Sequence, residues 1–126
     1  VLEAAHCRII LAAAGKQDAG ISKRPVPIEV IPGCLGLVLE RIKTAHPEAE
    51  CRIREGVPGT KAGPVITDNG AFVVDVEVPG ATLADLDAAY RSIPGVISTG
   101  IFLGHCEHLI TFDAATGGNV NTWSQL

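Results

Sequence analysis

Between residues 26 and 103 the spacing of the apolar residues switches repeatedly between a period of two, typical of strands, and a period of three to four, typical of helices. Residues 26–31 (VPIEVI) predict a short strand, in which Pro27 suits either a sheet edge or a strand start. Residues 34–46 predict an amphipathic helix that Pro47 ends. The apolar stripe of this helix comprises Leu35, Val38, Leu39 and Ile42.

The next segment predicts a half-buried strand and a hairpin. Residues 51–55 alternate between apolar and charged side chains, with Cys51 and Ile53 on the apolar side. The sequence Asp68-Asn69-Gly70 then separates two apolar runs, and Asn-Gly supplies the positive φ angles of a tight β-hairpin. The second strand of that hairpin places four apolar residues on one face, namely Phe72, Val74, Val76 and Val78.

A second helix and a final strand complete the pattern. Thr82, followed three residues later by Asp85, forms a capping box that predicts a helix start. Pro94-Gly95 ends this helix, and residues 96–103 predict a strand. The helix has an apolar stripe of Leu83, Leu86, Tyr90 and Ile93. The order strand, helix, strand, hairpin strand, helix, strand is that of a ferredoxin-like βαββαβ domain with both helices on one sheet face.

Three further strands are expected outside this domain. Residues 7–14 (CRIILAAA) form a continuous apolar run, which predicts a strand buried on both faces of a parallel sheet. Residues 108–112 and 120–123 predict two more strands, and 15–25 predict an exposed connection. These strands resemble parts of a second, larger sheet, most of which the chain does not contain, so the expected fold class is α+β.

Composition and charge narrow the range of functions that the chain could have. Hydrophobic residues make up 47% of the 126 residues and charged residues 19%, which excludes general disorder. The net charge of −4 leaves no basic field for a phosphate backbone, so nucleic acid is not an expected partner. No apolar run is long enough for a membrane span, and no secretion signal opens the chain. We therefore expect a soluble, non-exported protein; because the chain opens at Val1 and contains no Met, we also expect an upstream part.

The cysteines and histidines do not predict a metal site. The four cysteines are scattered along the chain without the close spacing of a zinc ribbon or a small disulfide scaffold, which indicates reduced and buried thiols. The run His105-Cys106-Glu107-His108 contains metal-ligand atoms, but adjacent side chains leave an extended chain on opposite faces. A zinc site would need further ligands, such as His6 or Cys7. A loop that enters a strand is the favoured interpretation, and no metal or other cofactor is expected.

Several stretches together resemble type A ribose-5-phosphate isomerase, and they follow one another in the family's order over almost all of the chain. The resemblance implies an aldose-ketose isomerase of the pentose phosphate pathway that interconverts ribose 5-phosphate and ribulose 5-phosphate through an enediol. The KAGPV stretch is more similar to eukaryotic members than to bacterial ones. The matching stretches are AAAGK (12–16), VPIEVIP (26–32), KAGPVITDNG (61–70), FVVDV (72–76) and IPGVISTGIF (93–102).

The resemblance covers only the C-terminal half or so of the family's length. It implies that residues 1–25 end a Rossmann-like domain, that 26–103 form a ferredoxin-like lid domain, and that 104–126 return to the Rossmann-like domain. The family's phosphate loop and its general-base Glu belong to the part that this chain lacks. The chain alone is therefore expected to be inactive, and it contributes no catalytic residue.

The resemblance assigns one residue of this chain to the family's ligand site. Lys16 matches the Lys that the family places there, which implies a substrate-binding role as a phosphate or sugar contact. The family usually has an acidic residue three positions earlier, where this chain has Ala13. Without the resemblance, Lys16 reads as a solvated loop lysine. Two carboxylates are not predicted to act as catalytic acid or base, because Glu3 is interpreted as an exposed helix residue and Asp68 as a turn residue.

The expected partners are a sugar-phosphate substrate and further copies of the same chain, without nucleic acid or membrane, in the cytoplasm. Homo-oligomerisation is implied by the family, whose members are usually dimers or tetramers. The alternative is a non-enzymatic ferredoxin-like module for dimerisation or small-molecule binding. Residues 7–14 separate the two hypotheses: a fully covered strand favours the module, and a bare edge favours a missing partner segment.

Overall fold

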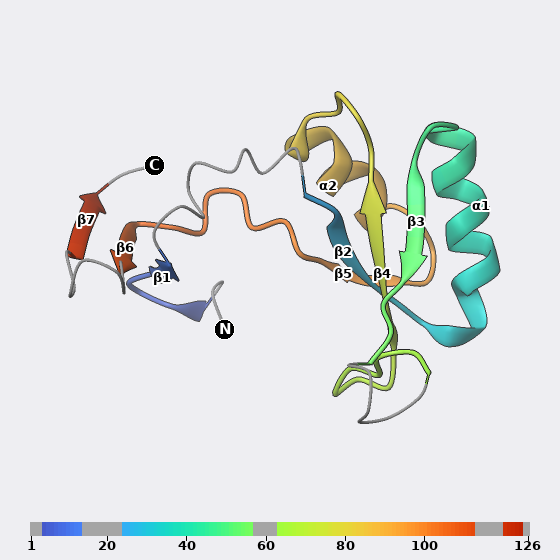
Figure 1. Cartoon of the computed structure of the whole chain (residues 1–126), viewed down its shortest axis with the longest axis horizontal. Helices are drawn as coiled ribbons and strands as arrows, with labels where there is room; N and C mark the ends of the chain where they lie inside the picture. The colour runs from blue at the N-terminus through green and yellow to red at the C-terminus, as the bar shows by residue number, and fades with distance from the viewer. Residues whose placement is uncertain (1–3, 14–23, 57–62, 113–119, 125–126) are drawn as a thin grey trace. The chain divides into compact units, whose positions relative to one another are not determined.

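The computed structural model describes residues 4–13, 24–56, 63–112 and 120–124 (Figure 1). The chain divides into two compact units. Unit 1 comprises Val1–Ile21 and Phe102–Leu126, and unit 2 comprises Ser22–Ile101. The structure is α+β, with an antiparallel sheet in unit 2 and a mixed sheet in unit 1.

The described residues of unit 2 form four strands and two α-helices in the order that the sequence predicts. Its sheet has the order β3-β4-β2-β5, and all three pairs of neighbouring strands are antiparallel. Neither α-helix is long and apolar enough to cross a membrane, and the same holds for the rest of the described residues. The elements are β2 (Val26–Val30), the short 3₁₀ helix η3 (Pro32–Cys34), α1 (Leu35–Ala45), β3 (Glu50–Ile53), β4 (Phe72–Glu77), α2 (Leu83–Arg91) and β5 (Val96–Thr99).

The core of unit 2 lies between one face of this sheet and both helices. Strand residues at alternate positions point into it, as the two-residue period predicts. The predicted helical stripes are confirmed, with two fully buried residues in each helix and partly buried neighbours at Leu35, Leu39, Leu83 and Ile93. The largest fully buried side chains of unit 2 are those of Ile28, Val30, Val38, Ile42, Val74, Val76 and Tyr90.

Strand β2 is an interior strand, so the edge position considered for Pro27 is wrong and its place near a strand start is confirmed. The Pro27 carbonyl accepts a hydrogen bond of 2.7 Å from the Gly100 amide. A Cβ at Gly100 would lie 2.4 Å from Cγ of Pro27. The proline ring is tolerated on this interior strand because its neighbour has no side chain.

The predicted hairpin forms a looser turn than the sequence indicates. Gly70 has a φ of +73°, and its amide donates to the Thr67 carbonyl at 2.9 Å. The Thr67 amide in turn donates to the Ala71 carbonyl, so three residues form the turn. Before the turn, Ile66 forms an isolated bridge with Phe72 of β4. The expected first strand of the hairpin is therefore reduced to an isolated bridge.

Two strand predictions need correction. Ile53 was expected on the buried side of β3, but 38% of its surface is exposed because β3 is the edge strand of the sheet. The final strand was expected over 96–103, but β5 ends at Thr99. The capping box is confirmed, since Thr82 Oγ1 accepts a hydrogen bond from the Asp85 amide at 3.3 Å.

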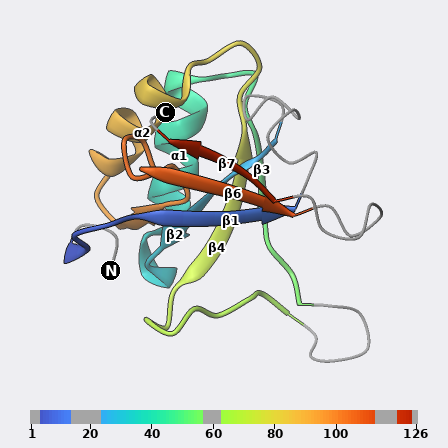
Figure 2. The ribbon, with the colours of Figure 1, turned by 90° about the vertical axis from the view of Figure 1, so that its left-hand side faces the viewer.

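Unit 1 contains a three-stranded sheet in the order β1-β6-β7, with β1 (Ile9–Ala13), β6 (His108–Phe112) and β7 (Val120–Ser124) (Figure 2). Strand β1 pairs in parallel with β6, from Ile9 opposite His108 to Ala13 opposite Phe112. The expected parallel pairing is confirmed, but burial on both faces is wrong. Ile9 is 52% and Leu11 75% exposed, because β1 is an edge strand and no described part of unit 1 covers that face.

Replacing Gly95 by alanine should destabilise unit 2 by about 3 kcal/mol, since overpacking and a positive φ each add to the cost. Gly95 has a φ of +96°, and an added Cβ would lie 2.3 Å from Cβ of Cys34. Gly36→Ala is the matched control, because nothing lies within 4 Å of its Cβ position in α1. That change should raise stability by up to about 1 kcal/mol. Urea unfolding monitored by circular dichroism measures both, and equal effects would contradict the packing argument.

Candidate functional site

The parallel pair β1 and β6 brings two carboxyl ends of strands to the same sheet edge. Ala13 and Phe112 are paired there, and Phe112 is 53% exposed. Ligands of α/β sheets bind at the carboxyl ends of strands. Lys16 follows Ala13 by three residues in the sequence, but it lies outside the described residues, as does Glu3. The structure therefore describes the sheet edge that leads to Lys16 and not the position of Lys16 itself.

The amino ends of the same two strands are held by an ion pair. Nη2 and Nε of Arg8 lie 2.7 and 3.0 Å from Oε1 of Glu107, and the amides of Glu107 and His108 donate to the Arg8 carbonyl. The hydrogen bond from Arg8 holds the pKa of Glu107 below its ordinary value. Glu107 thus joins β6 to β1 and is already engaged within its own unit.

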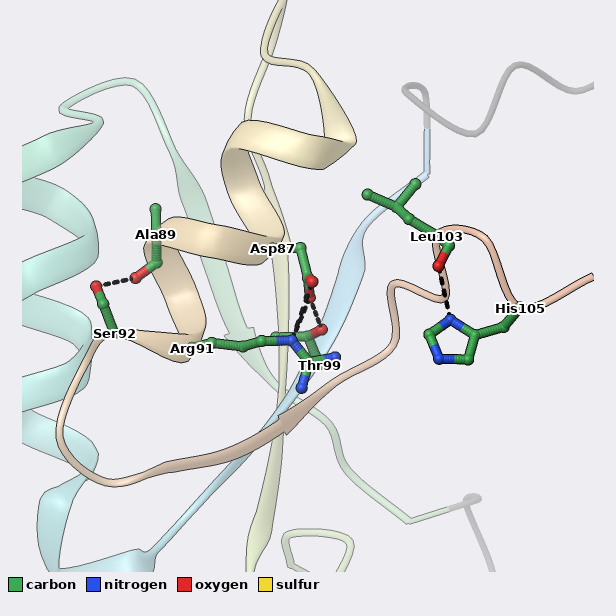
Figure 3. Close-up of polar contacts among 7 residues, drawn as sticks. All are labelled: Asp87, Ala89, Arg91, Ser92, Thr99, Leu103 and His105. Atoms are coloured by element: carbon green, nitrogen blue, oxygen red, sulfur yellow. Dashed lines mark hydrogen bonds and ion pairs between the residues drawn. The ribbon is translucent and has the colours of Figure 1, made fainter. Parts of the chain in front are cut away.

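The His105–His108 run does not form a metal site in the described part of the chain. His105 Nδ1 lies 2.7 Å from the Leu103 carbonyl oxygen. Figure 3 draws this contact as a dashed line. The ring of His105 packs edge-on against Phe102. Among the described residues, no group of three or more His, Cys, Asp or Glu side chains could hold a metal ion. His6 and Cys7, which were considered as further ligands, are not brought into such a group.

A polar cluster of unit 2 surrounds Glu29 on β2. Oε1 of Glu29 accepts hydrogen bonds from Thr67 Oγ1 at 2.6 Å and Asn69 Nδ2 at 3.0 Å, and Oε2 accepts one from Ser98 Oγ at 2.9 Å. The bonds from Thr67 and Asn69 are the main reason that the pKa of Glu29 is lowered. The carboxylate therefore ties the turn before β4 and the strand β5 to the central strand.

The sequence pattern alone does not single out Glu29. Its one signal is a carboxylate inside an otherwise apolar strand, VPIEV. The pattern draws attention to Asp68 instead, a residue of the turn, while its neighbours Thr67 and Asn69 donate to Glu29. The structural interpretation of this turn is consistent with these contacts.

A second polar cluster fastens α2 to β5 (Figure 3). The Thr99 hydroxyl donates to Asp87, and only 4% of the Thr99 surface is exposed. Arg91 Nε lies 2.9 and 3.0 Å from the two carboxylate oxygens of Asp87. On β4, Asp75 accepts two hydrogen bonds from Arg54. These clusters stabilise unit 2, and each carboxylate is engaged by a neighbouring donor.

Residues 1–115 match the family model described as ribose 5-phosphate isomerase A (phosphoriboisomerase A). The chain belongs to this family. The resemblance stated from the sequence stretches is therefore confirmed at the level of the family.

The individual relatives are all longer than this chain. The ribose-5-phosphate isomerase A of Pyrococcus abyssi is 43% identical over 81 residues, which are 64% of this chain and 34% of that protein. The solved structure from Methanocaldococcus jannaschii has a TM-score of 0.77 and 31% identity, over 96% of this chain and 51% of that one. A solved D-ribose-5-phosphate isomerase in complex with phospho-erythronic acid has a TM-score of 0.76 and 35% identity, over 93% and 49%. The chain thus spans about a third to a half of the length of these relatives.

Replacing Glu29 by glutamine should lower the free energy of unfolding at pH 7 by about 1–2 kcal/mol, because charge-assisted hydrogen bonds to the carboxylate are weakened. The folded pKa of Glu29 lies below its ordinary value of 4.5, so its stabilising effect is present above that value. The effect is lost as the pH falls through the folded pKa, and the difference between the two proteins should shrink below about pH 4.5.

Urea unfolding between pH 3 and pH 8 tests this prediction. Glu40→Gln is the control, because Glu40 is exposed on α1 and its side chain makes no hydrogen bond or ion pair within the described residues. The control should change stability by a few tenths of a kcal/mol, about the size typical of surface substitutions. A pH-independent loss in Glu29→Gln would show that the charge of Glu29 is irrelevant.

Proposed function

We propose that the chain is part of an enzyme that interconverts ribose 5-phosphate and ribulose 5-phosphate through an enediol, in the pentose phosphate pathway. The observation that carries this proposal is the match of residues 1–115 to the isomerase family. A relative solved with phospho-erythronic acid, a phosphorylated sugar acid, supports a sugar-phosphate substrate for this chain as well. The reaction requires no redox cofactor, since the proton that leaves one carbon is returned to its neighbour and the substrate is neither oxidised nor reduced overall.

The two units take different parts in this proposal. Residues 26–103 are assigned to a ferredoxin-like lid domain, which the βαββαβ order and the sheet order β3-β4-β2-β5 support. Residues 1–25 and 104–126 are assigned to a Rossmann-like domain, which the parallel pairing of β1 with β6 supports. The division of the chain into two compact units near these boundaries is consistent with both assignments.

The chemistry explains why this chain needs further groups. Isomerisation needs a base that takes a proton from the carbon beside the carbonyl and donors that hold the enediolate charge. Lys16 is assigned to the phosphate or another part of the sugar, because an ammonium beyond the carboxyl end of a strand suits an anionic ligand. The general base is assigned to the part of the family's sequence that this chain lacks.

The edge strand β1 argues against the alternative of a self-contained binding module. Ile9 and Leu11 are largely exposed, and β1 has a neighbour on one side only within the described sheet. Uncharged apolar edge strands invite pairing with another strand. The exposure of β1 therefore supports a larger Rossmann-like sheet, to which this chain contributes only some strands.

Assembly and location are proposed from the family and from the thiols. A homo-oligomer follows from the resemblance, since type A isomerases are usually dimers or tetramers. All four cysteines are free, at positions 7, 34, 51 and 106. Free thiols are typical of a reducing compartment, which supports a cytoplasmic location.

Replacing Lys16 by alanine should raise the KM for ribose 5-phosphate about 10-fold or more, the factor expected for one lost charged hydrogen bond. The measurement uses a chimera in which this chain replaces the matching segment of the Methanocaldococcus jannaschii protein. Lys23→Ala is the matched control, because it removes a lysine from the same connection without touching the family's motif. Unchanged kinetics in Lys16→Ala would remove Lys16 from the site.

This chain by itself, without the remaining segment of the Methanocaldococcus jannaschii protein, should show no turnover of ribose 5-phosphate, because no general base is assigned to it. The same coupled assay of ribulose 5-phosphate formation measures this, with the chimera as the positive control. Turnover by the chain alone at a rate near that of the chimera would contradict the assignment of the base.

A further inference from the structure

A pocket of about 290 Å³ lies on the helical side of unit 2, between the second half of α1 and the end of α2. Apolar side chains make up much of its wall, namely Ile42, Ala45, Ala89 and Ile93. This volume is at the small end of the range for small-molecule sites. Unit 2 supplies every lining residue of the pocket, and β1 and β6, to which the substrate is assigned, belong to unit 1.

Some polar groups that line this pocket already have hydrogen-bond partners within the protein, and others do not. Thr44 and Ser92 both line it, but their hydroxyls already donate to the carbonyls of Glu40 and Ala89 at 2.9 and 2.6 Å. Arg41 also lines the pocket; it is exposed, and its guanidinium makes no hydrogen bond or ion pair within the described residues. His46 lines the pocket too, and its Nδ1 lies 3.8 Å from Oε1 of Glu48. The guanidinium of Arg41 is therefore the charged donor of the wall that has no partner among the described residues.

Tyr90 also lines the pocket as a residue, and its hydroxyl has no hydrogen-bond partner among the described residues. The residue is 1% exposed, and this hydroxyl is buried. Burial raises the pKa of Tyr90 to about 12, so the hydroxyl keeps its proton at neutral pH. A buried hydroxyl without a partner is unusual in proteins and is commonly explained by a water or ligand atom.

We propose that this pocket binds a small organic monocarboxylate, whose apolar body packs against Ile42, Ala45 and Ala89 and whose carboxylate accepts from Arg41. A carboxylate is an acceptor without a hydrogen of its own, so it complements the unpaired donors of the Arg41 guanidinium. The charge-assisted pairing of a carboxylate with a guanidinium is stronger than a neutral hydrogen bond. The proposal does not depend on the isomerase function.

Benzoate is a suitable probe, because its ring matches the apolar wall, and benzyl alcohol is the neutral control of similar size. Amide NMR spectra of the ¹⁵N-labelled chain are recorded while each compound is added. Benzoate should shift resonances of residues 41–46 and 89–93 saturably, with an affinity about 10-fold higher than that of benzyl alcohol, as one charged hydrogen bond predicts. Equal affinities, shifts elsewhere in the chain, or no shifts with up to about 10 mM benzoate would overturn the proposal.

Two variants and one control sharpen the test. Arg41→Gln should remove the preference for benzoate and leave the weaker binding of benzyl alcohol unchanged. Ala45→Leu should fill the pocket and weaken both compounds, and Ala45 is exposed at the end of α1, where a larger side chain is tolerated. Arg52→Gln removes an exposed arginine of β3 that pairs with Glu50 and should change nothing. A preference for benzoate that survives in Arg41→Gln would overturn the proposal even if Ala45→Leu fails to fold.

Discussion

The structure of unit 2 depends on the burial of one face of its central strand. Val26, Ile28 and Val30 lie on that face of β2, and none is more than 6% exposed. Burying an aliphatic side chain contributes about 1.5–3 kcal/mol, and both helices are held on the sheet by such contacts. Because β2 also pairs with β4 on one side and β5 on the other, the rest of the unit is assembled around it.

The opposite face of the same strand gathers the polar contacts. Glu29 lies between the buried residues Ile28 and Val30 along β2, so its side chain points away from the core. There it meets Thr67, Asn69 and Ser98 from two other segments. A strand that alternates between apolar and polar residues thus organises the core on one side and a hydrogen-bonded turn on the other.

Local sequence patterns predicted the helices and strands well, but they predicted the burial and the packing partners of these elements less well. Thr82 and Asp85 located the start of α2 because a capping box acts within a few residues. The exposure of Leu11 could not be predicted, because an apolar run does not reveal whether a partner is present to cover it. The cavity beside Arg41 is equally invisible in the sequence, since it arises between two helices that are far apart along the chain.

What the sequence determined by itself is the type and order of the helices and strands, together with the family that its stretches resemble. These properties follow from periodicity, caps and motifs, which act over short distances along the chain. Only the tertiary structure decided the sheet order, the end of β5 at Thr99 and the partners of Glu29. The donors to Glu29 lie 38, 40 and 69 residues away in sequence, and no local pattern specifies a contact over such separations.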